Sequence, residues 1–122
     1  MNEKKRSGDR GEALVAAYLR RRGYTILETQ FRTRQGEIDI IARSPEDYLC
    51  FVEVKTRKDA KFAEAREFVT PDKQRKLRAA ARYYLAKCGD MDLICRFDVA
   101  EVYLGEGIFR ISRINYIPQA FE

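Results

Sequence analysis

The chain has 122 residues, of which 24 are lysine or arginine and 19 are aspartate or glutamate, and its formal net charge is +5. Hydrophobic residues make up 45% of the composition, which is enough for one core, so residues 1–122 are expected to form a single domain. The absence of histidine excludes histidine-dependent triads, histidine acid–base pairs and histidine metal sites. Any catalysis must therefore use carboxylates, lysine, tyrosine, cysteine or a bound metal. An isoelectric point near 9.2 favours a polyanion, and nucleic acid first, as the partner.

The cysteines predict a reducing environment. Cys50, Cys88 and Cys95 are odd in number and form no C-x-x-C pair, so neither a disulfide framework nor a zinc site is indicated. Residues 1–10 are charged and lack the apolar stretch of a signal peptide, and no apolar run is long enough to span a membrane. We expect a cytoplasmic protein without a membrane partner.

The first half of the chain predicts one helix followed by three strands. Apolar residues recur at helical spacing from Asp9 to Arg22, and Gly23 is a suitable C-terminal cap. Three extended runs follow, separated by turn-forming residues, and they predict an antiparallel meander. These runs are Tyr24 to Arg32, Glu37 to Arg43 and Tyr48 to Thr56.

The second half predicts another helix and two more strands. The segment 57–69 is polar and leaves a mobile loop and a short helix both open. Thr70-Pro71 is a strong helix start, with threonine as N-cap and proline in the first turn, and Gly89 is expected to end that helix. Strands follow at Leu93 to Leu104 and Ile108 to Tyr116. The predicted fold is α/β (α+β), a central mixed sheet flanked by helices in the order α-β-β-β-α-β-β.

Three charged residues are predicted to converge on two neighbouring strands. Side chains alternate along a strand, so Glu53 and Lys55 share a face at the end of a strongly apolar run. A hairpin at residues 44–47 would bring Asp39 close to Glu53. Glu12 lies at the margin of the apolar stripe on the first helix and could face the same site.

This set suits metal-dependent phosphodiester chemistry. Asp39 and Glu53 offer the hard oxygen ligands that Mg²⁺ or Mn²⁺ prefers, and Lys55 could contact a water or a phosphate. The alternative is an ion pair between Glu53 and Lys55 on an exposed strand, which the additional acids Asp39 and Glu12 argue against. Glu37 is interpreted as structural, paired with an arginine such as Arg34.

Basic residues on the second predicted helix suggest a surface for nucleic acid. Arg75, Arg78 and Arg82 fall at positions i, i+3 and i+7, a spacing that suits successive phosphates. Lys73 and Lys76 add to this cluster. A solvated helix face is the alternative. Further along the chain, Arg96 and Asp98 are expected to form a structural pair near the sheet edge.

Taken in order, four motifs resemble those of the YraN family, from about Gly8 to Tyr116. They are Gly11-Glu12, Gly36-Glu37-Ile38-Asp39-Ile40-Ile41-Ala42, Phe51-Val52-Glu53-Val54-Lys55-Thr56-Arg57 and Arg96-Phe97-Asp98-Val99. That family is grouped with restriction-endonuclease-like nucleases, notably Holliday junction resolvases.

The resemblance implies a PD-(D/E)XK site and a restriction-endonuclease-like fold. Asp39 would be the D, Glu53 the E and Lys55 the K, and Val54 would offer its carbonyl to the metal. Glu12 would match the helix acid of the resolvases. The chain departs from the motif at its proline, where it has Ile38.

Three functions follow as hypotheses. The first is a Mg²⁺- or Mn²⁺-dependent DNA endonuclease of the resolvase or repair type. The second is a catalytically silent nucleic-acid-binding module, and the third is a protein-interaction or assembly factor. A homodimer is left open. Fold analogy alone does not choose among them.

Overall fold

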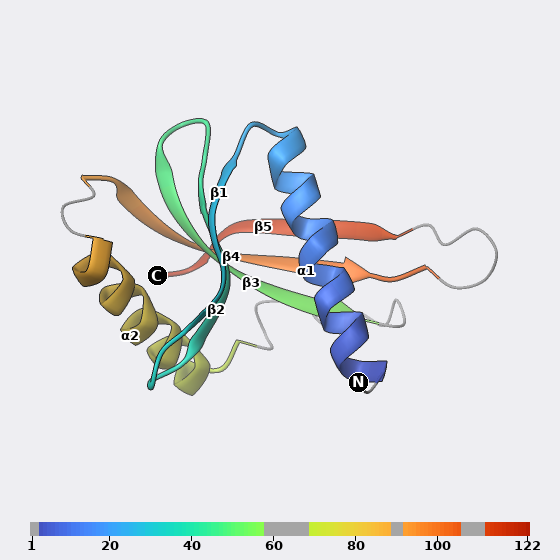
Figure 1. Cartoon of the computed structure of the whole chain (residues 1–122), viewed down its shortest axis with the longest axis horizontal. Helices are drawn as coiled ribbons and strands as arrows, with labels where there is room; N and C mark the ends of the chain where they lie inside the picture. Colours follow the sequence, from blue (N-terminus) through green and yellow to red (C-terminus); the bar gives the residue numbers. More distant parts are fainter. Residues whose placement is uncertain (1–2, 58–68, 89–91, 106–111) are drawn as a thin grey trace.

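In the part of the chain that the structure describes, a five-stranded sheet with a helix on each face forms the framework. The computed structural model describes residues 3–57, 69–88, 92–105 and 112–122. The strands lie in the order β1-β2-β3-β4-β5. Figure 1 shows α1 (Glu3–Arg21) and α2 (Pro71–Cys88) apart, with the twisted sheet between them. The elements broadly follow the expected order, and the fold is mixed α+β.

Helix α1 covers one face of the sheet with Val15 and Leu19, which are fully buried. Its C-terminus is capped as predicted, because Gly23 has a φ of 86° and Tyr24 N–H donates to the Leu19 carbonyl at 3.0 Å. The helix begins at Glu3 instead of Asp9. Residues 3–8 carry good helix formers but no apolar stripe, so hydrophobic periodicity could not detect them.

The meander was predicted correctly. Strands β1 (Thr25–Arg32), β2 (Glu37–Arg43) and β3 (Tyr48–Arg57) pair antiparallel. The β1–β2 turn is closed by Thr33, whose Oγ1 accepts the N–H groups of Gln35 and Gly36.

A crossover then carries the chain to the other face. The undecided segment 57–69 lies almost wholly outside the described residues, since residues 58–68 are not described. Thr70 is the N-cap of α2 as predicted, with Oγ1 3.2 Å from Lys73 N. The helix buries Leu77, Ala80, Ala81 and Tyr84, and Tyr84 meets the Phe51 ring edge-on at 6.1 Å. Strand β4 (Ile94–Tyr103) follows, parallel to β3.

The last strand was misplaced in the sequence interpretation. It was expected at Ile108 to Tyr116, whereas β5 runs from Arg113–Phe121, and residues 106–111 lie outside the described part. Pro118 would be unfavourable in an interior strand, but β5 is an edge strand, where a proline need not donate to a neighbour. Phe121 stacks on Phe97 with 5.0 Å between ring centroids, and this contact extends the core to the end of the chain.

Asp98 anchors the centre of the sheet. It is fully buried in β4 and accepts two hydrogen bonds from Arg96, at 2.8 and 3.0 Å. Tyr116 Oη and Gln119 N also donate to it. The structural pair predicted for Arg96 and Asp98 is present on β4, the strand next to the edge strand β5. Both carboxylate oxygens are fully engaged, which is typical of a buried structural acid.

Among the helices formed by the described residues, none has the length and apolarity required to cross a membrane.

Helix α1 lies very close to β3 at Gly11. A Cβ built at Gly11 would overlap Thr56 Oγ1 and would lie 3.5 Å from Thr56 Cβ. The missing side chain at Gly11 therefore lets the helix cross the strand at this point. The crossing fixes where the next residue, Glu12, meets the sheet.

The close approach of Gly11 to Thr56 predicts that Gly11→Ala changes stability in opposite directions in the wild type and in a Thr56→Ala background. Gly11→Ala should destabilise the protein by about 1 to 2 kcal/mol, because overpacking outweighs the roughly 1 kcal/mol gain in helix propensity. In a Thr56→Ala background the obstructing oxygen is gone, so Gly11→Ala should stabilise. Urea denaturation of the four proteins checks this. A destabilising effect in both backgrounds would show that Gly11 is required for another reason.

Candidate functional site

The site forms where strands β2 and β3 stop pairing. Their ladder runs from Arg43–Leu49 to Ile40–Val52, and β3 then continues beside β4 alone. Asp39 lies just past the last pair, and its Oδ2 accepts the Val54 N–H at 2.8 Å. The carboxylate thus takes the place of a backbone acceptor from β2.

The side-chain alternation of β2 is interrupted at the same point. Ile38 and Ile41 pack in one core cluster, with α2, although they are three residues apart, whereas Ile40 packs in the other. A strict period of two would put Ile38 and Ile41 on opposite faces. The irregularity coincides with Asp39, which lies at the gap between β2 and β3.

Glu53 lies on the α2 face of the sheet and is only 5% exposed. Two lysine ammonium groups share its Oε1: Lys73 Nζ lies at 3.3 Å and Lys55 Nζ at 3.9 Å. Lys55 comes from the same strand and Lys73 from the first turn of α2. The predicted neighbourhood of Glu53 and Lys55 is therefore present, and Lys73 is an additional member.

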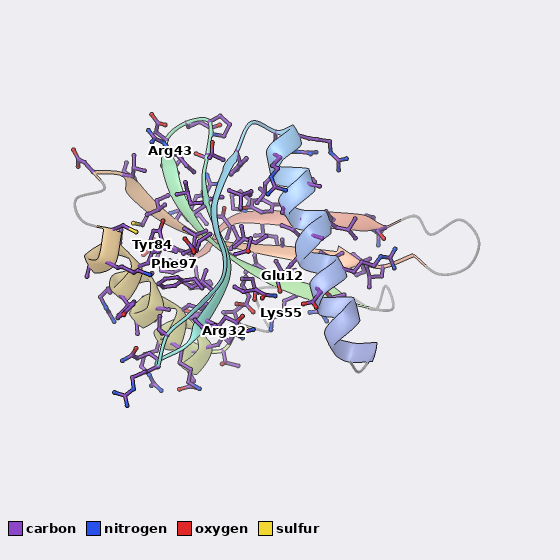
Figure 2. The ribbon with its side chains drawn as sticks, viewed as in Figure 1. Glu12, Arg32, Arg43, Lys55, Tyr84 and Phe97 are labelled. Atoms are coloured by element: carbon purple, nitrogen blue, oxygen red, sulfur yellow. The ribbon has the colours of Figure 1, made fainter. Side chains whose placement is uncertain are left out.

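Glu12 approaches the site from α1, next to the Gly11 crossing. Figure 2 shows Glu12 and Lys55 in the region where α1 passes over β3. Burial raises the pKa of Glu12, a hydrogen bond with Gln30 opposes that rise, and the negative charges of Glu37, Asp9 and Glu53 add to it. Glu12 is thus within electrostatic range of Glu53.

The surroundings of Asp39 disfavour a negative charge on its carboxylate. Burial raises its pKa to about 7, and the neighbouring Glu53 carboxylate contributes further, with smaller effects from Glu12 and Glu37. The Val54 N–H opposes this rise by binding the charged form. Both main causes, desolvation and like charge, would be relieved by a cation at the site.

The carboxylates at this position would supply only some of the ligands of a bound cation. In the described part of the chain, no three histidine, cysteine, aspartate or glutamate side chains are grouped closely enough to hold a metal. Mg²⁺ is commonly held by one or two carboxylates, with water and substrate phosphate as the remaining ligands. Asp39 and Glu53 fit that kind of site, and Glu12 does not complete a preformed cage.

The predicted basic cluster on α2 divides into two sets. Lys73 faces Glu53, whereas Arg75 and Lys76 pair with Asp72, the lysine at 3.2 Å. Of the other two arginines, Arg78 donates to the backbone carbonyl of Glu122, and Arg82 is exposed. Elsewhere, Glu37 pairs with Arg32 at 3.4 Å instead of with Arg34.

Sequence reasoning did not find two features of the site. Gln30, with a φ of 50°, contacts Asp9 and Glu12 on the α1 side, where these residues line a shallow cleft of about 320 Å³. Glu101 is 2% exposed, pairs with Arg57 at 2.7 Å and lies in register with Lys55. The sequence did contain a signal for Glu101, because a glutamate in the apolar run of β4 is unusual. It contained no comparable signal for Gln30.

The raised pKa of Asp39 predicts that replacing this residue with a neutral one stabilises the protein, and that the gain is larger at high pH. Between pH 3.8 and about 7 the unfolded chain ionises while the folded protein keeps its proton, so stability falls as the pH rises through this window. Asp39→Asn retains an acceptor for Val54 N–H. It should stabilise the metal-free protein at pH 8 by on the order of 2 kcal/mol and have little effect at pH 4.

Denaturant titrations in EDTA at pH 4, 6 and 8 measure this. Asp92→Asn, at an exposed position before β4, is the matched control and should change stability by less than about 0.5 kcal/mol. A loss of stability in Asp39→Asn at pH 8 would mean that the charge is needed for folding.

The comparisons with known proteins all indicate the same family. The model of the uncharacterised protein family UPF0102 matches residues 11–102. A UPF0102 protein of Acetivibrio thermocellus is 45% identical over 124 aligned residues, covering 98% of this chain and 94% of the relative. A UPF0102 protein of Clostridioides difficile is 45% identical over 121 residues, covering 99% and 100%. One from Geobacter sulfurreducens is 44% identical over 115 residues, covering 94% and 88%. The chain belongs to the UPF0102 family, the YraN family that its motifs resemble.

Proposed function

We propose that this protein is a divalent-metal-dependent DNA endonuclease of the resolvase or repair type. One observation carries the proposal: two carboxylates, Asp39 and Glu53, lie together where β2 and β3 separate, with the Lys55 ammonium 3.9 Å from Glu53. Carboxylates and a lysine are the groups that phosphodiester hydrolysis needs around its metal.

The local charge supports a cation at this place. Asp39 has a raised pKa because it is buried beside Glu53, so both acids would gain from Mg²⁺ or Mn²⁺. Asp39, Glu53 and the Val54 carbonyl would hold the ion, with Glu12 nearby. When bound, such an ion supplies an activated water and neutralises charge on the phosphate.

The residues of the chain have separate roles in this proposal. Asp39 is held in place by the Val54 N–H at 2.8 Å, which orients its free oxygen. Lys55 stabilises the negative charge that develops as water attacks the phosphorus and an ester oxygen departs. Its side chain is 27% exposed, so it can reach a bound phosphate from a sheltered position.

A nucleic-acid surface is proposed on α2. Arg75 and Arg82 are exposed on this helix, and the whole chain has a net charge of +5. Phosphate contacts from such residues position a duplex without reading its sequence. DNA is the expected nucleic acid, and the substrate would be selected by its shape.

A second candidate is a binding module without catalysis. It is favoured by the two lysines at Glu53, which balance that carboxylate without any metal. The two candidates differ in their dependence on Mg²⁺ or Mn²⁺. Incubating the protein with labelled linear, flapped and four-way DNA, in Mg²⁺, Mn²⁺ or EDTA, separates them.

Lys55→Met should separate chemistry from binding. The substitution keeps most of the stem and removes the ammonium, so folding and Mn²⁺ binding should be retained, whereas cleavage should fall by about 10² to 10³. Lys87→Met, which removes an exposed lysine from the last turn of α2, outside the predicted basic cluster, is the matched control and should cleave like the wild type. Cleavage of any of these DNAs by Lys55→Met at the wild-type rate would make Lys55 a structural partner of Glu53.

The basic surface predicts a change in salt dependence. Replacing Arg75 and Arg82 with glutamine should weaken DNA binding and lower the slope of log affinity against log salt by about 2, since each lost phosphate contact removes about 0.9. Fluorescence anisotropy from 50 to 300 mM salt, roughly the range in which such slopes are measured, tests this. The control replaces Arg22, in the turn after α1, and Arg43, on β2, with glutamine, since both are exposed and lie away from α2. An equal slope for both variants would mean that only total charge matters.

A further inference from the structure

Lys73 occupies a defined position in the first turn of α2. Its N–H is 3.2 Å from the capping Thr70 Oγ1, and Gln74 Nε2 donates to the Val69 carbonyl at 2.9 Å. These contacts fix the start of the helix against the chain that enters it. Lys73 Nζ lies 3.3 Å from Glu53 Oε1, closer than Lys55 at 3.9 Å.

The two partners differ in how freely they can move. The Lys73 side chain is 42% exposed, whereas Glu53 is 6% and Lys55 is 27% exposed. Lys55 shares a strand with Glu53, so its backbone is fixed beside the carboxylate. Lys73 reaches in from another element on a flexible stem and can turn out to solvent.

We propose that Lys73 is the resident counter-ion of Glu53, which holds this carboxylate in the metal-free protein and leaves it when a divalent cation binds. Lys73 is thus a positioning residue of the site and not part of the exposed basic surface of α2. The role as counter-ion rests on the ion-pair geometry, and the exchange rests on the proposed metal dependence.

The exchange of Lys73 for a cation follows from the repulsion between two positive charges at one carboxylate. A buried carboxylate without a positive partner is costly, so the metal-free protein needs an ammonium group at Glu53. A divalent cation on the same carboxylate would lie a few ångströms from the Lys73 ammonium, and the two would repel each other. Lys73 therefore competes with the metal, and once displaced it is placed beside the metal to meet a substrate phosphate.

The counter-ion role is tested first without metal. In EDTA, Lys73→Met should lower stability, and Glu53→Gln should remove most of that effect, because the double-mutant cycle isolates the pair. Lys76→Met in place of Lys73→Met is the control, since Lys76 pairs with Asp72, and it should show no coupling to Glu53. Lys73→Gln repeats the cycle with a polar side chain. Additive effects in both Lys73 cycles would overturn the proposal.

The exchange is tested with Mn²⁺ alone, by titration calorimetry and thermal shift. Lys73→Met should bind Mn²⁺ about tenfold more tightly than the wild type, because the competing charge is gone. Lys73→Arg and Lys76→Met should bind like the wild type. Equal or weaker binding by Lys73→Met would overturn the exchange.

The two proposals fail in different ways. If the wild type binds no Mn²⁺ but Lys73→Met does, Lys73 blocks the metal without giving way to it, so the counter-ion role stands and both the exchange and the metal dependence of the wild type are wrong. If neither binds, both the metal dependence and the exchange are wrong, and the metal-free cycle alone decides whether Lys73 is a counter-ion. If both bind equally, the metal dependence stands and the exchange is wrong.

Discussion

The hydrogen bond from Val54 N–H to Asp39 is the contact on which the candidate site depends. It lies directly beyond the last β2–β3 pair, so a side chain of β2 continues the interaction that its backbone has left. Full pairing would occupy that N–H with a carbonyl and leave the carboxylate without its anchor. Because the strands separate here, Glu53 on the α2 face and Glu12 on the α1 side both lie near the same gap. The interruption in the ladder is thus what allows acids from different elements to interact.

Asp98 and Asp39 show how one residue type takes opposite roles. Asp98 is fully buried and receives donors from Arg96, Tyr116 and Gln119, so its charge is balanced within the protein. Asp39 has a single donor among the contacts described, and its neighbours are other acids. The first arrangement stabilises the sheet, whereas the second is unfavourable without a cation. Such an unbalanced acid is expected where stability has been exchanged for function.

Local signals in the sequence predicted much of this structure. Helical spacing, the Gly23 cap and the Thr70 N-cap are properties of neighbouring residues, and they identified both helices, although α1 begins at Glu3 instead of Asp9. Alternation predicted that Glu53 and Lys55 are neighbours. The pairing of Lys73 with Glu53 could not be predicted, because it depends on how a crossover helix docks on the sheet. The same applies to β5, where Pro118 is tolerated only because the strand lies at an edge.

The two electrostatic demands of the proposed activity act at different distances. The chain as a whole carries a charge of +5, which attracts a polyanion from far away. At the gap between β2 and β3, Glu12, Asp39 and Glu53 lie with two described lysines, and the raised pKa of Asp39 means that a cation there would favour its charged form. Helix α2 contributes to both, since Lys73 faces the acids while Arg75 and Arg82 face solvent. A phosphate drawn to the helix would therefore arrive beside carboxylates whose charge a bound cation would neutralise.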